Sequence, residues 1–186
     1  MEATIDVGGE QRGRAREGKL DLDALATLDV STLGEMYAAA PSPTSVSGLT
    51  GHPRGRMLAI RNLDRGAAFA RIRGLAGAAA FPWGGKSFTG AGENGAGENR
   101  VHLMGRHRLF PFLTKVAPSQ IDRRPCVVLD YALSDNPWLI RQIHDEVREI
   151  EPGLWLGPAM WKAEKGPALV LWFALDTRVQ ARPIGG

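Results

Sequence analysis

Ala80-Phe-Pro-Trp-Gly-Gly-Lys-Ser-Phe88 is the stretch that decides which fold this chain adopts. Read loosely, it fits the nucleotide-binding P-loop pattern, with Gly85-Lys86-Ser87 at its end. A P-loop connects a buried strand to a helix, so that backbone N–H groups and the helix dipole converge on phosphate. Here the order is reversed, because helical spacing precedes residue 80 and a strand-like segment follows Gly85. The stretch therefore predicts a turn that ends a helix and opens a strand.

A second nucleotide motif lies just beyond it, where Gly90-Ala-Gly-Glu-Asn-Gly95 spells the dinucleotide-binding pattern GxGxxG. That motif requires a strand before it and a helix after it. Residues 90–99 are instead a tandem pentapeptide, Gly-Ala-Gly-Glu-Asn written twice. Glycine-rich segments of this kind need only turns to explain them. We interpret residues 90–99 as a hairpin loop and expect no nucleotide or other cofactor.

Composition is that of an ordinary globular chain with one core. The chain has 186 residues, 44% of them hydrophobic, and a formal net charge of +3, which is too mildly basic for a nucleic-acid-binding stripe. Its single cysteine, Cys126, excludes an intramolecular disulfide and favours a reducing, cytoplasmic compartment. The apolar runs fall well short of the roughly 20 residues of a membrane span, so we expect neither a membrane nor a nucleic acid as partner.

The chain divides into a tail, one domain and a short end. We interpret residues 1–18 as a disordered tail, residues 19–178 as a single domain and residues 179–186 as a flexible C-terminus. Two short helices are expected at the start of the domain, the second opened by the capping-box pattern Thr32-Leu-Gly-Glu35. Helical spacing of apolar residues predicts further helices over residues 64–79 and 136–150.

The remaining segments have the character of strands. β-branched and aromatic residues bounded by turn signals predict strands at residues 56–60, 86–89, 100–104, 109–114, 126–132, 154–161 and 168–175. Pro111 indicates an edge or a bulge. About seven mostly consecutive strands predict an antiparallel barrel or sandwich rather than a doubly wound sheet. The expected class is mainly β, a barrel with accessory helices, one of them inserted before the last hairpin.

Three stretches carry a resemblance to a known family. Gly51-His-Pro-Arg-Gly55 has both glycines of a GXWXG motif with proline in the tryptophan position, Trp83-Gly-Gly-Lys86-Ser-Phe88 matches a W-x-G-K-x-F segment, and Leu156-Gly157 with Trp172-Phe-Ala-Leu175 matches closing strands. Over residues 22–176 the chain resembles small bacterial lipocalin-like domains of the GXWXG type. The resemblance implies a lipocalin-like barrel over residues 19–178. A shared architecture does not by itself imply a function.

Aromatic residues on or beside the predicted strands are the candidates for a ligand-binding wall. A small closed barrel either fills with side chains or holds one ligand. The wall candidates are Trp83, Phe88, Phe112, Trp155, Trp161 and Trp172. Composition alone does not separate a pocket from a packed core, because pockets are also mostly apolar.

Strand parity sorts the polar candidates, since alternate residues share one face of a strand. In the strand that begins at Cys126, Tyr131 shares a face with the larger apolar set, whereas Asp130 shares a face with Cys126. We expect Tyr131 to point into the barrel and Asp130 to face out or to pair with an arginine such as Arg100. If a bulge inverts this parity, Asp130 becomes a buried carboxylate and a candidate general base.

Two basic residues are candidates for a charged barrel mouth. Lys86 is either solvated at the start of its strand or, with Arg100, receives an anionic ligand head such as a carboxylate. The four histidines show no metal-ligating spacing, and His102 and His107 are five apart across the Gly105 turn. We therefore expect no metal, and His102 stays a candidate acid or base.

Three functions remain open at this level. The first is binding of a hydrophobic small molecule, with aromatic walls, Tyr131 as an internal hydrogen-bonding group and Lys86 or Arg100 at the rim. The second is a cofactor-independent cyclase or isomerase for a polyketide- or terpenoid-like substrate of secondary metabolism, with Asp130, Tyr131 or His102 as acid or base. The third is a packed barrel that serves protein association, such as a homodimer.

The interior of the barrel discriminates among these functions. A closed cavity with two or more inward polar groups favours catalysis, because acid–base chemistry needs positioned titratable groups. A purely apolar cavity favours binding. A barrel filled with side chains excludes both and favours association.

Overall fold

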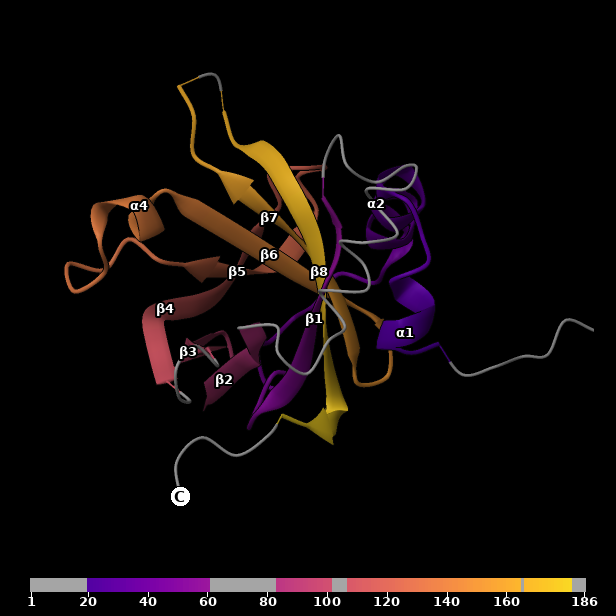
Figure 1. The fold of residues 1–186 in the computed structure, drawn as a ribbon, viewed down its shortest axis with the longest axis horizontal. Coiled ribbons are helices and arrows are strands. Elements are labelled where there is room, and N and C mark those ends of the chain that lie inside the picture. The colour runs from indigo at the N-terminus through magenta and orange to yellow at the C-terminus, as the bar shows by residue number, and fades with distance from the viewer. Residues whose placement is uncertain (1–19, 61–82, 102–106, 165, 182–186) are drawn as a thin grey trace, which may run out of the picture.

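The computed structural model of the protein describes residues 20–60, 83–101, 107–164 and 166–181. Antiparallel strands β1 to β8 close into a barrel, in which each strand pairs with its sequence neighbours and β1 pairs with β8 (Figure 1). The strands are Pro53–Ile60, Trp83–Ala91, Asn94–Val101, His107–Pro118, Pro125–Asp130, Ile143–Glu151, Leu154–Trp161 and Ala168–Gln180. The predicted class and the antiparallel barrel are confirmed, with eight strands rather than about seven.

Short helices complete the described part of the chain. They are α1 (Leu22–Leu25), α2 (Val30–Ala39) and α4 (Trp138–Arg141). The N-cap of α2 is Asp29, whose side chain accepts from the Thr32 backbone N–H at 2.8 Å, so the helix begins earlier than the capping-box pattern predicts. The helix predicted over residues 64–79 lies outside the described residues. No helix among the described residues has the length and apolar character needed to cross a bilayer.

The largest correction concerns the segment predicted as a helix over residues 136–150. Only α4 is helical there, and Ile143–Glu151 forms β6 between β5 and β7. This segment lacks the alternation of apolar and polar residues that identifies a strand. Its inward face carries Asp145 between Ile143 and Val147, and its outward face carries charged residues that are also buried. A strand with polar residues on both buried faces loses the usual alternation of apolar and polar residues.

The glycine repeat, predicted as a hairpin loop, is mostly strand in the structure. Residues 90–99 form the end of β2, a turn at residues 92 and 93, and most of β3, and in this hairpin Gly90 pairs with Gly95 and Ala91 pairs with Asn94. Gly97 is required by close approach, because a Cβ atom there would collide with the Ser87 carbonyl and lie 2.6 Å from the Phe112 ring. The repeat therefore supplies strand positions where neighbouring chains come too close for a side chain.

Pro111 lies at a β-bulge, which is one of the two settings, a sheet edge or a bulge, that the sequence predicts for it. The pairs Gly97–Phe112 and Asn99–Leu109 leave Phe110 and Pro111 of β4 opposite one residue of β3. Phe110 has φ of 57°, a left-handed conformation that costs energy in a bulky residue. The bulge directs the Phe110 ring into the barrel and its carbonyl toward Asn99.

The barrel interior is packed at one end and hollow at the other. At the packed end, the segment before β1 brings Val46 and Leu49 against Phe88, Trp155 and other interior residues. The remaining buried members of this cluster are Phe112, Val127, Leu129, Tyr131, Val147, Phe173 and Leu175. The cavity end lies around Trp83, Ile143 and Leu171.

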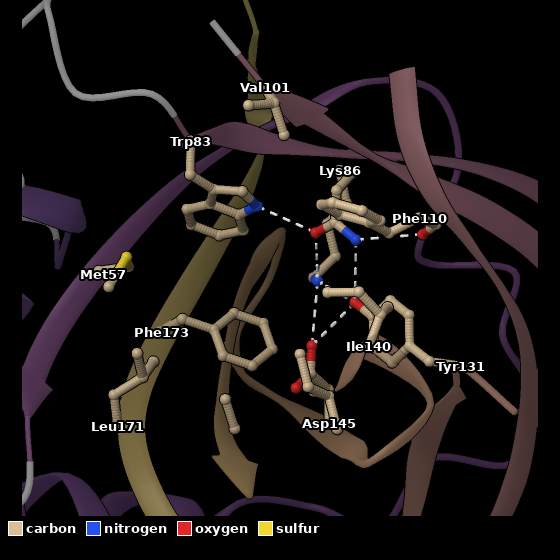
Figure 2. A pocket seen from close by; sticks show the side chains of 13 residues that line it. Met57, Trp83, Lys86, Val101, Phe110, Tyr131, Ile140, Asp145, Leu171 and Phe173 are labelled. Atoms are coloured by element: carbon tan, nitrogen blue, oxygen red, sulfur yellow. Dashed lines mark hydrogen bonds and ion pairs between the residues drawn. The ribbon is translucent and has the colours of Figure 1, made fainter. Parts of the chain in front are cut away.

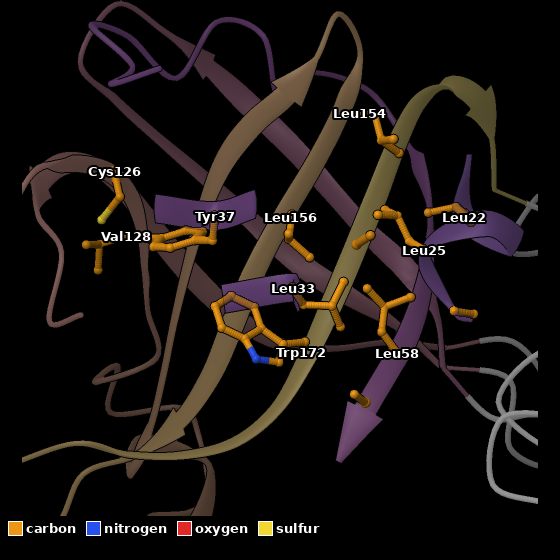
Figure 3. Close-up of a cluster of buried hydrophobic side chains, with 13 residues drawn as sticks. Leu22, Leu25, Leu33, Tyr37, Leu58, Cys126, Val128, Leu154, Leu156 and Trp172 are labelled. Carbon is orange, nitrogen blue, oxygen red and sulfur yellow. The ribbon is translucent and has the colours of Figure 1, made fainter. Parts of the chain in front are cut away.

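A second core lies outside the barrel wall, under α1 and α2 (Figure 3). Leu25, Leu33 and Tyr37 from the helices pack on outward residues such as Leu58 and Trp172. The Tyr37 and Trp172 rings are 5.5 Å apart. These two clusters explain why so many strands are apolar on both faces.

Gly34 offers a stabilising substitution in α2. A Cβ atom at this position would meet Trp172 Cζ2 at 3.6 Å, an ordinary van der Waals distance. Since alanine is favoured over glycine within a helix, Gly34→Ala should raise the free energy of unfolding by about 0.5–1 kcal/mol. Urea unfolding followed by tryptophan fluorescence measures the change. A loss of stability would show that the backbone at Gly34 is strained or crowded.

Outward residues of β6 form a buried polar cluster beneath α2. Glu146 accepts from Ser119 Oγ at 2.6 Å, Tyr37 Oη at 3.0 Å and the Gln120 backbone N–H at 2.6 Å, and it contacts His144 Nε2 at 2.9 Å. Burial raises the pKa of Glu146, but the hydrogen bonds from His144, Ser119, Gln120 and Tyr37 outweigh it, so the pKa is lowered overall. The carboxylate joins α2 and the segment after β4 to the barrel wall.

Because its pKa is lowered on folding, Glu146 should contribute stability above the pKa of an unfolded glutamate, about 4.3. This contribution disappears as the pH falls through the lower folded-state pKa. Glu146→Gln should therefore be less stable than the wild type at pH 7, by about 1–3 kcal/mol, and the difference should narrow below about pH 4.3. Thermal unfolding from pH 7 to pH 3 checks this, with Glu35→Gln, at an exposed position of α2, as the control. A difference that is constant with pH would contradict the assignment.

Candidate functional site

An apolar cavity of about 260 Å³ lies at the cavity end of the barrel interior (Figure 2). Its apolar walls are Met57, Trp83, Val101, Phe110, Ile140, Ile143, Ala159, Leu171 and Phe173. The polar residues that line it are Lys86, Asn99, Tyr131 and Asp145. The volume is just below the roughly 300–1,000 Å³ typical of ligand pockets, so the cavity suits a small molecule.

Lys86 is the centre of the polar group, and four strands bring its members together. Its Nζ lies 2.6 Å from Tyr131 Oη, 2.9 Å from Asn99 Oδ1 and 3.0 Å from Asp145 Oδ2. Lys86, Asn99 and Asp145 lie on β2, β3 and β6, and Tyr131 directly follows β5, so the group exists only in the closed barrel. Three oxygen neighbours match the three N–H donors of an ammonium group.

Aromatic rings surround the same ammonium group. Nζ lies 5.2 Å from the ring centroid of Phe173, 5.3 Å from those of Phe112 and Tyr131, and 5.5 Å from that of Trp83. A cation within about 6 Å of an aromatic face is attracted by the ring quadrupole. The rings and the ion pair together hold a charge that is only 3% exposed.

Asn99 and Tyr131 complete the hydrogen-bond network. Asn99 Oδ1 also accepts from Trp83 Nε1 at 3.0 Å, and its Nδ2 donates to the Phe110 carbonyl and to Tyr131 Oη, each at 3.2 Å. Tyr131 Oη in turn donates to Asp145 Oδ2 at 3.0 Å. The bulge at Phe110 therefore orients Asn99, which then presents its oxygen to Lys86.

The environment shifts the pKa of two of these groups. Burial lowers the pKa of Lys86, and the Asp145 carboxylate opposes this without reversing it. Burial, followed by the charge of Asp145, raises the pKa of Tyr131 well above its usual value. Tyr131 is thus a neutral phenol that donates its hydrogen bond to the carboxylate.

Asp145 keeps one oxygen unused within this network. Its side chain is 5% exposed, and among the described residues its Oδ1 has no hydrogen-bond partner. Figure 2 shows this oxygen directed away from the contacts that Asp145 makes with Lys86 and Tyr131. This oxygen is itself buried, and a buried carboxylate oxygen without a donor is unfavourable.

The structure places some of the predicted polar residues where the sequence indicates and others elsewhere. Tyr131 points into the barrel, as parity indicates. Lys86 is not at the rim but inside the network, and Arg100 lies on the outer face of β3, where its Nη1 donates to Ser87 Oγ at 3.1 Å. Asp130 faces outward, with its side chain 40% exposed and 3.6 Å from Lys162 Nζ. His102 lies outside the described residues.

The predicted aromatic wall is also redistributed. Trp83 lines the cavity. Three other candidates do not line it and belong to the packed interior of the barrel, namely Phe88, Phe112 and Trp155. Trp172 is on the outer face under the helices. Trp161, half-buried at the end of β7, does not line the cavity. Parity separates Trp172 from its neighbour Phe173, which is the residue that reaches the cavity.

Sequence reasoning missed Asn99 and Asp145 for identifiable reasons. Asn99 ends the glycine repeat, which was predicted as a loop, and Asp145 lies in the segment predicted as a helix. The available signal was the alternation of Ile143, Asp145 and Val147, which places the carboxylate on an otherwise apolar strand face.

Known proteins show little similarity to this chain. No protein-family profile and no curated protein matches it. Among solved structures, the crystal structure of a protein from Thermomonospora curvata aligns with 17% sequence identity and a TM-score of 0.45. That alignment covers 80% of this chain and 87% of the other chain.

Proposed function

We propose that the protein binds a small, largely apolar molecule in the barrel cavity. The carrying observation is the apolar cavity of about 260 Å³, which has polar groups on one part of its wall and a packed core behind it. Ligand pockets typically combine apolar walls with a few convergent polar groups that fix orientation. The lipocalin-like resemblance of the sequence agrees with this role, and the single cysteine agrees with a cytoplasmic setting.

Binding ranks ahead of catalysis because most polar capacity in the cavity is already used. Four inward polar residues meet the condition that favours an acid–base site. However, Lys86, Asn99 and Tyr131 satisfy one another and Asp145 Oδ2. The cavity therefore offers a ligand mainly its apolar walls, which suits binding of an apolar molecule.

Filling the cavity should abolish binding. Ala159 lines the cavity, and Ala159→Phe would place a ring in the space that the ligand occupies. Native mass spectrometry of freshly purified protein should show a hydrophobic molecule on the wild type and none on this variant. Ala168→Phe, at an exposed position of β8, is the matched control and should retain it. A wild type free of any adduct that also binds no apolar probe would contradict the proposal.

A second candidate, a cofactor-independent isomerase or cyclase, is favoured by one observation. The Asp145 carboxylate lines the apolar cavity, and Tyr131 and Lys86 both contact its Oδ2. A carboxylate so placed is suited to take a proton from carbon next to a ketone and return it elsewhere on the same substrate. This reaction class needs positioning and one base.

Deuterium exchange tests this candidate without knowledge of the substrate. 2-Tetralone carries α-protons next to a ketone on an apolar frame, and the incorporation of deuterium from D₂O at these positions is measured by mass spectrometry. Positioned general bases contribute about 10²–10⁴-fold, so the wild type should accelerate exchange well above buffer, whereas Asp145→Asn should not. Equal rates with both proteins would exclude Asp145 as a base and leave binding as the function.

A further inference from the structure

We infer that the cavity selects uncharged ligands, and that Asp145 determines this selection by neutralising Lys86 from within the protein. The inference rests on the proposed binding function and adds the class of ligand and the residue that sets it. From the sequence, Lys86 is a candidate receptor for an anionic ligand head such as a carboxylate. In the structure, the carboxylate beside Lys86 is that of Asp145.

The charges of the cavity lining already cancel. Among the described residues that line the cavity, Lys86 is the cation and Asp145 is the anion. Their Nζ and Oδ2 atoms lie 3.0 Å apart, and the two side chains are only 3% and 5% exposed, so salt screens the pair little. Arg100, the other candidate cation, lies on the outer face of β3 and donates to Ser87. A charged ligand therefore meets a lining that is neutral overall.

The hydrogen-bond donors of the lining are also engaged within the protein. Lys86 Nζ donates to Asn99 Oδ1, Tyr131 Oη and Asp145 Oδ2, which uses its three protons. The Asn99 amide donates to a backbone carbonyl of β4 and to Tyr131 Oη, and Tyr131 donates to Asp145. Trp83 Nε1 donates to Asn99 Oδ1. A ligand carboxylate would lose its hydration and gain no donor from these residues in return, which is unfavourable among apolar walls.

A cationic ligand is disfavoured by the same ion pair. The Asp145 carboxylate would attract a ligand ammonium, but Lys86 Nζ already lies 3.0 Å from that carboxylate. Two positive charges would then share one carboxylate in a cavity with few other polar groups. Like charges repel strongly where water does not separate them. The geometry therefore favours ligands without a charge of either sign.

Two matched pairs of bicyclic probes test this selection by calorimetric titration of the wild type. 2-Acetylnaphthalene and 2-naphthoate differ by a methyl group in place of a charged oxygen, and 2-ethylnaphthalene and 2-naphthylmethylamine differ by a methyl group in place of an ammonium. This ring system suits a cavity of about 260 Å³ with aromatic walls such as Trp83, Phe110 and Phe173. The neutral member of each pair should bind at least about tenfold more tightly, because the ion loses its hydration without compensation.

The outcomes separate the inference from the binding function. If the naphthoate or the amine binds as tightly as its neutral partner, or more tightly, the inference is overturned while the binding function stands. If no probe binds but the purified protein carries a small molecule, an uncharged molecule supports the inference and a carboxylic acid or an amine overturns it. If no probe binds and the protein carries no small molecule, both proposals fail.

Asp145→Asn assigns the selection to one residue. The substitution keeps the shape of the side chain, removes the negative charge and leaves Lys86 without its counter-ion. The preference for 2-acetylnaphthalene over 2-naphthoate should fall at least about tenfold, because the lining then attracts an anion instead of being neutral overall. Asp130→Asn is the matched control on the outer face, with its side chain 40% exposed, and should keep the wild-type preference.

A double variant shows whether the change acts through Lys86. Lys86→Met combined with Asp145→Asn leaves neither charge, so the wild-type preference for the neutral probe should return. Thermal unfolding confirms that each variant is folded. An unchanged preference in folded Asp145→Asn overturns the role of Asp145, and so does a gain in naphthoate binding that persists in the double variant. The wild-type pairs test the selection independently if a variant does not fold.

Discussion

Lys86→Met should lower the free energy of unfolding by about 3–5 kcal/mol, the usual effect of removing one partner of a buried ion pair. The substitution leaves Asp145 charged, 5% exposed and without the ammonium at 3.0 Å. It also removes the donors to Asn99 Oδ1 and Tyr131 Oη. Since small proteins are stable by only about 5–15 kcal/mol, this loss is a large part of the total. Urea unfolding followed by tryptophan fluorescence measures it.

A second variant shows whether the loss comes from the unpaired charge. Lys86→Met combined with Asp145→Leu replaces the ion pair with apolar side chains and should recover most of the stability, as such replacements are often neutral. Arg108→Met is the surface control, because Arg108 is 52% exposed and 3.3 Å from Glu98, and it should change stability by less than about 1 kcal/mol. A loss below about 1 kcal/mol in Lys86→Met would show that the buried pair is not required.

Arg148→Met should also cost about 3–5 kcal/mol, on the opposite face of the barrel wall. The Arg148 side chain is fully buried and donates to both Asp122 carboxylate oxygens, at 2.7 and 2.6 Å. It also donates to the backbone carbonyls of Tyr37, Arg124 and Pro125. Methionine preserves much of the apolar length but supplies none of these donors, so buried oxygens of α2 and of the β4–β5 connection lose their partner.

The geometry of the guanidinium group provides the control for this prediction. Arg148→Lys keeps the positive charge but lacks the planar fork that binds both oxygens of Asp122, so it should recover only part of the stability. Urea unfolding ranks the wild type, the lysine variant and the methionine variant in that order. Hydrogen exchange should show faster exchange in residues 119–124 of Arg148→Met. A methionine variant as stable as the wild type would contradict this role.

The antiparallel strands and the direction of Tyr131 could be predicted because they depend on local patterns. Alternation along the strand from Cys126 places Val127, Leu129 and Tyr131 on one face, and the apolar set faces the interior. Turn residues between consecutive strands indicate antiparallel neighbours. These features follow from the backbone geometry of a strand and require no knowledge of distant contacts.

The candidate site could be predicted only in part, because its members meet across strands. The sequence indicates Trp83, Lys86 and Tyr131 as candidates, and these three line the cavity. From the sequence, Lys86 is predicted either to be solvated or to lie at the barrel mouth, because a lysine is rarely buried without partners. Its partners Asn99 and Asp145 come from β3 and β6, whose own patterns are obscured by glycines and by charges.

The sequence by itself determined that this chain forms consecutive antiparallel strands after N-terminal helices, and which face of the strand at Cys126 is inside. Only the tertiary structure decided that residues 143–151 form a strand and that Lys86, Asn99, Tyr131 and Asp145 meet. The physical reason is that strand alternation reports burial on one face at a time. Residues such as Asp145 and Glu146 are buried on opposite faces of the same strand, by the barrel interior and by α2. Their burial depends on partners distant in the sequence, which only the closed barrel brings within hydrogen-bonding distance.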